Sequence, residues 1–151
     1  MTNQPIKIVI VDDHEIIRQG LVTLLQDEPD LAILGQAVDG QEAISLIQTT
    51  QPDVVLLDIK MDGMNGLEAI PHILTVKPDT KIIMLTMYGE ENFFYTALGA
   101  GAMGYFLKGS DSKELVHAIQ TVQTGRIYLS PKLAQDLVQA YQKQQNPPFT
   151  S

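Results

Sequence analysis

The sequence predicts an α/β protein in which helices cover both faces of an open, doubly wound parallel sheet. Three observations support this prediction. Near-continuous apolar runs of strand length recur along the chain, segments with helical spacing separate them, and capping signals mark several helix starts. Apolar runs without alternation are typical of parallel strands, because crossover helices bury both faces of such a sheet.

Five strands are expected, and four of them are strong. Each strong run ends at, or directly before, a polar or charged residue. The expected strands are residues 6–11, 31–38, 53–58, 81–86 and 103–108. The run at 31–38 is the weaker candidate, because its apolar residues are less continuous.

Helices are expected between these strands. Asp39, Asn65 and Asp111 each stand three residues before a glutamate, a spacing that resembles a capping box. The βα alternation over about 125 residues favours right-handed crossovers and a flavodoxin-like strand order, 2-1-3-4-5. Gly125 closes the fifth helix, and Ser130-Pro131 predicts the cap and first turn of a sixth helix that runs to about Gln144.

The sixth helix has an apolar stripe that we expect to pack on its own domain, with self-association as the alternative. Its members are Leu133, Leu137, Val138 and Tyr141. The Gln- and Pro-rich residues that follow are predicted to be a disordered tail. We therefore expect one domain at residues 1–125 and a linker helix with its tail at residues 126–151.

Composition limits the function classes. The 151 residues carry a formal net charge of −8, and residues 1–66 hold eleven acids against three bases, so bulk attraction to nucleic acid or anionic membranes is not expected. The chain has no cysteine, which excludes disulfides, thiolate zinc sites and cysteine nucleophiles. Without a membrane-length apolar run or a signal segment, a soluble cytoplasmic protein is expected.

Charged and polar residues mark the ends of the expected strands. Asp12, Asp13, Asp58, Thr86 and Lys108 all stand at carboxyl ends, where ligands bind in open α/β sheets. Three converging carboxylates repel one another unless a cation compensates, and hard oxygen ligands suit Mg²⁺. With such a cation, one carboxylate can attack a phosphoryl group while lysine and threonine contact its oxygens.

Structural interpretations of single residues compete with this one. Taken alone, each acid could cap a helix, Lys108 could be solvated, and Thr86 could end a strand. Their joint placement at the ends of neighbouring strands disfavours these interpretations. His14 beside the acids is expected to face solvent, because a magnesium site of oxygen ligands does not need imidazole.

Five motifs together resemble the receiver domains of two-component response regulators. They are Val-Asp-Asp-His at 11–14, Leu-Leu-Asp-Ile-Lys-Met at 56–61, Met-Asn-Gly at 64–66, Leu-Thr at 85–86 and Gly-Tyr-Phe-Leu-Lys at 104–108. The resemblance implies a CheY-like fold, in agreement with the doubly wound sheet expected from the residues. It also implies a phosphorylation-dependent signalling switch of a two-component system.

The resemblance also implies roles for individual residues. Asp58 would accept a phosphoryl group from a sensor histidine kinase, and Asp13 and Asp58 would bind Mg²⁺ or Mn²⁺ together with the backbone carbonyl of Lys60. Asp12 would act through a metal-bound water, and Lys108 would contact the phosphoryl group.

A second set of residues would transmit or tune the signal. Thr86 would move toward the phosphoryl group, Tyr105 would change rotamer, and the fourth helix and fifth strand would shift as the output. Lys60, Met87 and Tyr88 would tune the lifetime of the acyl phosphate. Tyr105 could instead be static packing at the sheet edge.

Three positions depart from the family's pattern. Asp62 replaces the proline that often stands four residues after the acceptor, which loosens the loop and adds a carboxylate near the metal. Met87 stands where small residues are common and could slow the access of attacking water. Gly109 follows the lysine in place of proline, so the usual cis peptide bond is not assumed.

The stretch at 125–131 and the helix after it look like the NarL/FixJ-type regulators with a LuxR-family output domain. That resemblance implies transcriptional regulation through a C-terminal helix-turn-helix domain, which residues 145–151 are too short to contain. The chain is then a piece of a longer regulator, with DNA binding in the absent part, or a natural stand-alone receiver that acts by protein–protein interaction. A phosphorylation-promoted homodimer is expected, through helices 1 and 5 or through the helix 4, strand 5, helix 5 face.

Rival functions fit less well. A haloacid dehalogenase-type phosphatase, which uses an aspartate nucleophile and Mg²⁺, needs a second acid at position 60, where this chain has Lys60. A flavodoxin-like flavin carrier needs an anion-friendly loop after the first strand, and the two acids there would repel the flavin phosphate. An unphosphorylated interaction module would not need the acid, threonine and lysine set. We expect no enzymatic turnover beyond slow self-dephosphorylation.

Overall fold

The structure, a computed structural model, describes residues 4–61, 63–87 and 93–144. Strands and helices alternate along this part of the chain. Their bounds are β1 (Ile6–Val11), α1 (Glu15–Leu25), β2 (Leu31–Ala37), α2 (Gly40–Thr50), β3 (Val54–Asp58), α3 (Gly66–Val76), β4 (Lys81–Thr86), α4 (Phe94–Ala100), β5 (Gly104–Leu107), α5 (Ser112–Gln123), β6 (Tyr128–Leu129) and α6 (Pro131–Gln144).

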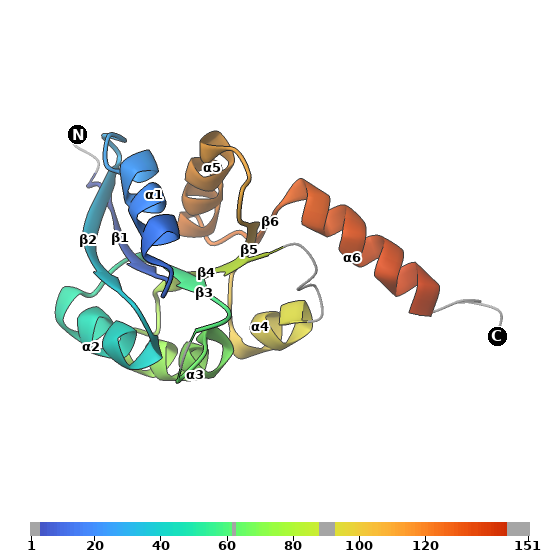
Figure 1. Ribbon diagram of the computed structural model, residues 1–151, viewed down its shortest axis with the longest axis horizontal. Helices are drawn as coiled ribbons and strands as arrows, with labels where there is room; N and C mark the ends of the chain where they lie inside the picture. Colours follow the sequence, from blue (N-terminus) through green and yellow to red (C-terminus); the bar gives the residue numbers. More distant parts are fainter. Residues whose placement is uncertain (1–3, 62, 88–92, 145–151) are drawn as a thin grey trace.

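The strands form one parallel sheet in the order β2-β1-β3-β4-β5-β6. Helices α1 and α5 cover one face, and α2, α3 and α4 cover the other (Figure 1). The doubly wound fold and the order of the first five strands are thus confirmed. Because β1 and β3 are neighbours, as are β3 and β4 and then β4 and β5, the carboxyl ends of these strands lie along one edge.

Two hydrophobic clusters, one on each face, hold the helices to the sheet. Successive side chains of β1 point to opposite faces of the sheet. Ile8 and Ile10 pack toward α1 and α5, and Val9 and Val11 pack toward α2 and α3. All four side chains are fully buried. Burial of both faces explains why the strand sequences show continuous apolar runs instead of alternation.

The capping signals are satisfied to different degrees. Asn65 and Glu68 form a complete reciprocal capping box at the start of α3. The Asp39 carboxylate accepts from the Glu42 N–H as expected, but the Glu42 side chain accepts from Val38 N–H one residue upstream. The stability of these helix starts therefore depends on local side-chain acceptors for otherwise unpaired N–H groups.

A sixth strand corrects the expectation of five. Tyr128 N–H donates to Met103 O and Ser130 N–H donates to Tyr105 O, so the segment before α6 pairs with β5. Two strand residues are too few to produce a readable pattern of apolar spacing. The hydroxyl of Ser130 accepts a hydrogen bond from Leu107 N–H, which ties the start of α6 to β5.

Helix α6 extends away from the rest of the domain (Figure 1). Its first half packs on the domain, because Leu133 and Leu137 are buried in the cluster that covers β5. Its second half does not, because Val138 and Tyr141 are about half exposed. The apolar stripe is therefore divided between core packing and free surface. The expected disordered tail at residues 145–151 lies outside the described residues.

No helix in the described ranges has both the length and the hydropathy that crossing a membrane requires.

Candidate functional site

The fold brings the predicted polar residues to one edge of the sheet. Asp12 and Asp13 directly follow β1, Asp58 ends β3, Thr86 ends β4, and Lys108 directly follows β5. Since these four strands are consecutive in the sheet, the residues meet although up to 96 positions separate them in sequence.

Lys108 links the acids. Its Nζ lies 2.9 Å from Asp12 Oδ2 and 3.0 Å from Asp58 Oδ1, and only 9% of its side chain is exposed. Its backbone N–H donates to Thr86 O at 2.7 Å, which fixes the lysine beside the end of β4. Burial by itself lowers the pKa of Lys108, but the contacts with the two carboxylates outweigh burial and raise that pKa above its ordinary value.

The pKa of Asp58 is raised well above its ordinary value. Burial raises its pKa from 3.8 to about 6, against the contact with Lys108, which lowers it, and the nearby charges of Asp12 and Asp13 raise it further. One lysine therefore does not compensate the desolvation of this carboxylate. A second positive charge is needed for three ionised carboxylates to share the site.

The start of helix α3 lies close against the end of strand β3, which carries Asp58. Gly66 donates its N–H to Ile59 O, and a Cβ at position 66 would lie 2.0 Å from the carbonyl oxygen of Asp58. A glycine is therefore required at the first position of α3. This close approach fixes the backbone that carries Asp58.

The acids suit a divalent cation. Asp12, Asp13, His14 and Asp58 each offer one ligand atom, and these atoms all lie within 4.8 Å of one another. Within the described part of the chain, Asp13 Oδ1 and Asp58 Oδ2 are buried without a hydrogen-bond partner. Buried carboxylate oxygens without donors are costly, and a hard cation is the natural partner for them.

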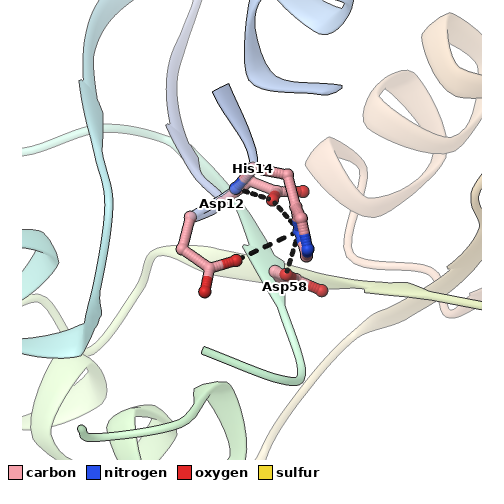
Figure 2. A group of neighbouring side chains, drawn as sticks. Asp12, His14 and Asp58 are labelled. Carbon is pink, nitrogen blue, oxygen red and sulfur yellow. Dashed lines mark hydrogen bonds and ion pairs between the residues drawn. The ribbon is translucent and has the colours of Figure 1, made fainter. Parts of the chain in front are cut away.

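His14 is exposed to solvent as predicted, but its ring also contacts the acids, which the sequence did not predict. Although 62% of its side chain is exposed, Nδ1 lies 3.2 Å from Asp12 Oδ1 and 3.1 Å from Asp13 Oδ1. Figure 2 shows its ring beside the carboxylates of Asp12 and Asp58. The available signal was its position directly after two acids at a helix start, where the short turn returns the side chain toward them.

The expected switch residues are both buried: Thr86 ends β4 at this edge, and Tyr105 lies within β5 beside Met84 of β4. Thr86 is fully buried, and its hydroxyl donates to Met87 O at 3.2 Å. Tyr105 is 2% exposed and packs edge-on against Phe94 of α4, with ring centres 5.2 Å apart. Its ring thus joins β5 to α4.

Of the residues expected to tune the phosphoryl lifetime, the structure describes Lys60 and Met87. Lys60 follows Asp58 by two residues, and its Nζ lies 5.8 Å from the centre of the Phe93 ring. Met87 is 51% exposed. Tyr88 and Asp62 lie outside the described residues. Gly109 has φ of 89°, a value that proline cannot adopt, so this departure from the family's pattern is built into the turn.

A doubly wound sheet with an acid and lysine site at its carboxyl edge defines the class of CheY-type signalling domains. The receiver domain of Thermotoga maritima CheB, at 30% identity, superposes with a TM-score of 0.73 over 80% of this chain and 98% of that chain. The model of the response regulator receiver domain matches residues 8–120, and the chain belongs to that family.

Relatives narrow the subfamily. The response regulator GacA of Pseudomonas aeruginosa is 41% identical over 148 residues, which cover 97% of this chain and 69% of that protein. The transcriptional regulatory protein DegU of Brevibacillus brevis is 36% identical over 91% of this chain, which spans 58% of the DegU sequence. A LuxR-family two-component response regulator from Aurantimonas shares 37% identity and a TM-score of 0.85, over 91% of this chain and 99% of that chain. The resemblance to NarL/FixJ-type regulators is confirmed.

Proposed function

We propose that this chain is a phosphorylation-controlled switch in which Asp58 accepts a phosphoryl group from the phosphohistidine of a sensor kinase. The observation that carries the proposal is the bridge from Lys108 Nζ to Asp12 Oδ2 and Asp58 Oδ1, at 2.9 and 3.0 Å. It pairs the nucleophile with a buried ammonium that can bind a phosphoryl oxygen, as phosphoryl transfer requires.

The chemistry is an exchange at phosphorus. A carboxylate oxygen of Asp58 attacks the phosphorus, the P–N bond to the kinase imidazole breaks, and a P–O bond forms to give an acyl phosphate. Lys108 then exchanges its contact with the Asp58 carboxylate for a phosphoryl oxygen. Asp58 is nearly enclosed, with 5% of its side chain exposed, which restricts the access of water to the product.

The acids would hold Mg²⁺ or Mn²⁺. Asp13 and Asp58 are its expected side-chain ligands with the backbone carbonyl of Lys60, and Asp12 would contact it through water. When bound, the cation supplies positive charge for the developing phosphoryl oxygens and for the carboxylates. The buried, unpaired oxygens of Asp13 and Asp58 support this assignment.

The output would pass through Thr86 and Tyr105. A phosphoryl group adds negative charge that a threonine hydroxyl can approach, and such new contacts shift a two-state equilibrium because they exist in one state alone. After movement of Thr86, Tyr105 would change rotamer, and its ring contacts Phe94 of α4. Lys60, Met87 and Tyr88 would set how fast water reaches the acyl phosphate.

The regulated process would be transcription in the cytoplasm. The names of DegU, a transcriptional regulatory protein, and of the LuxR-family structure support a transcriptional regulator. Its DNA binding would belong to a helix-turn-helix domain C-terminal to the receiver. Phosphorylation would promote a homodimer, through α1 and α5 or through α4, β5 and α5. The receiver at residues 1–125 would be joined to that output domain by the linker at residues 126–151. Apart from slow self-dephosphorylation, the chain would not be an enzyme.

The test is the covalent adduct. The protein is incubated with phosphoramidate and Mg²⁺, and intact mass is measured for the wild type, Asp58→Asn and the control Asp53→Asn, which alters the opposite end of β3. We expect one phosphoryl group on the wild type and on Asp53→Asn, none on Asp58→Asn, and none with a chelator. An adduct that persists in Asp58→Asn, or fast turnover of a phosphate ester without an adduct, would overturn the proposal.

A further inference from the structure

His14 is placed unusually for a residue at a helix start. It is the N-cap of α1, with φ of −89° and ψ of 109°, yet its side chain makes no capping hydrogen bond to the helix. Its backbone N–H donates to Asp12 Oδ1 at 2.9 Å. This turn directs the imidazole toward the acids, where the signalling chemistry proposed above gives it no role.

Two of the three distances from the ring nitrogen match the separation of neighbouring ligands around one metal ion. Nδ1 lies 3.1 Å from Asp13 Oδ1, 3.2 Å from Asp12 Oδ1 and 3.9 Å from Asp58 Oδ2. Neighbouring ligands of an octahedral ion with bonds of about 2.1 Å are about 3.0 Å apart. One ion can therefore contact the nitrogen and carboxylate oxygens with small movements of the side chains.

Among the described residues, the carboxylate oxygens that face His14 accept no hydrogen bond from a lysine or arginine. Lys108 contacts Asp12 Oδ2 and Asp58 Oδ1, whereas Asp13 Oδ1 and Asp58 Oδ2 accept no hydrogen bond from the described residues. These oxygens lie on the side that faces His14, whose Nδ1 is 3.1 Å from Asp13 Oδ1 and 3.9 Å from Asp58 Oδ2. Because 62% of the His14 side chain is exposed, an ion can reach the ring from solvent.

The donor set has a chemical consequence. Mg²⁺ prefers oxygen ligands and retains several waters, whereas imidazole is a favourable ligand for Co²⁺, Ni²⁺ and Zn²⁺. We propose that His14 Nδ1 is a ligand of the cation at the Asp12, Asp13 and Asp58 site and shifts its preference from Mg²⁺ toward first-row transition metals. This inference rests on the proposed function in one respect, because both use the same cation site.

The competing explanation is a hydrogen bond in which the ring donates to Asp12 and no ligation occurs. Selectivity measured on the wild type does not separate the two, since transition metals bind most oxygen sites more tightly than Mg²⁺ does. The discriminating quantity is the change in the ratio of Co²⁺ to Mg²⁺ affinity when the imidazole is removed.

The experiment titrates the whole chain with Co²⁺ and, separately, Mg²⁺ by calorimetry, and records the visible spectrum of the Co²⁺ form. Wild type is compared with His14→Ala, with His14→Gln, and with His72→Ala as a control on an exposed face of α3. Circular dichroism verifies that each variant is folded. We expect both His14 variants to weaken Co²⁺ about tenfold or more and Mg²⁺ less than about threefold, and to shift the Co²⁺ spectrum, while His72→Ala changes neither.

An equal loss of affinity for both metals, or an unchanged Co²⁺ spectrum in the His14 variants, would overturn the ligand assignment and leave the proposed function intact. Mg²⁺ binding that survives Asp13→Asn and Asp58→Asn together would instead remove the cation site, and the proposed function would fail with it.

Discussion

The Asp58 carboxylate gives the sharpest stability prediction. Its pKa is raised to about 6 in the folded protein by burial, against 3.8 as the ordinary value that the unfolded chain should show. Folded Asp58 therefore holds its proton to a higher pH than unfolded Asp58 does. Between these two values the folded state binds more protons, so the free energy of unfolding of the metal-free protein falls as pH rises through this window.

The size of the effect follows from the separation of the two pKa values. About two pH units at 1.36 kcal/mol each give a loss of about 3 kcal/mol between pH 4 and pH 7. Asp58→Asn cannot ionise, so its free energy of unfolding should not fall over this pH range. Its stability is reduced only by the loss of the ion pair between Lys108 and the ionised Asp58 carboxylate. The variant should thus be more stable than the wild type at neutral pH by up to about 3 kcal/mol, with a much smaller difference near pH 4.

Urea unfolding across this pH range in the presence of a chelator measures the difference directly. Asp27→Asn, a change at an exposed acid, is the matched control and should follow the wild-type profile. Saturating Mg²⁺ should raise the stability of the wild type more than that of Asp58→Asn, because binding to the folded state alone stabilises it. Profiles for Asp58→Asn and wild type that run parallel from pH 4 to pH 7 would refute the reasoning.

Three further predictions concern packing, a close approach and a cap. Leu137→Ala should cost about 2 kcal/mol in urea unfolding, whereas Val138→Ala, on the exposed half of α6, should change stability by less than about 0.5 kcal/mol; equal losses would contradict the divided stripe. Gly66→Ala forces a Cβ against the Asp58 carbonyl and should slow phosphorylation by phosphoramidate as well as lower the melting temperature, while Gly99→Ala, with open space around its Cβ, should do neither. Asn65→Ala removes the capping box at the start of α3 and should lower the free energy of unfolding by about 1 kcal/mol. An unchanged free energy of unfolding would contradict a stabilising role for this cap.

The bounds of the central strands could be predicted closely, because strands buried on both faces appear in the sequence as continuous apolar runs. The runs at 6–11 and 81–86 coincide with β1 and β4, and the run at 53–58 differs from β3 by one residue. The convergence of Asp12, Asp58 and Lys108 followed from the same pattern, since parallel strands place their carboxyl ends at one edge.

Features that depend on side-chain direction or on very short pairings could not be predicted this way. The orientation of His14 depends on one turn in which its own backbone N–H bonds to Asp12, and apolar spacing carries no record of it. Strand β6 exists because Tyr128 and Ser130 donate to the backbone of the segment around β5, a tertiary contact that two strand residues cannot reveal. Which residues of α6 are buried also depends on tertiary packing: Leu133 and Leu137 lie in the cluster beside β5, and Val138 and Tyr141 lie beyond it.

A crystal structure of the protein with Mn²⁺ and trifluoroberyllate, a phosphoryl mimic, tests the central claim most directly. The account predicts an anomalous peak between Asp13 and Asp58, the beryllium bonded to an Asp58 oxygen, and Lys108 Nζ in contact with a fluorine. An ion bound elsewhere, or an unmodified Asp58 that keeps its contact with Lys108 in the presence of the mimic, would contradict the account.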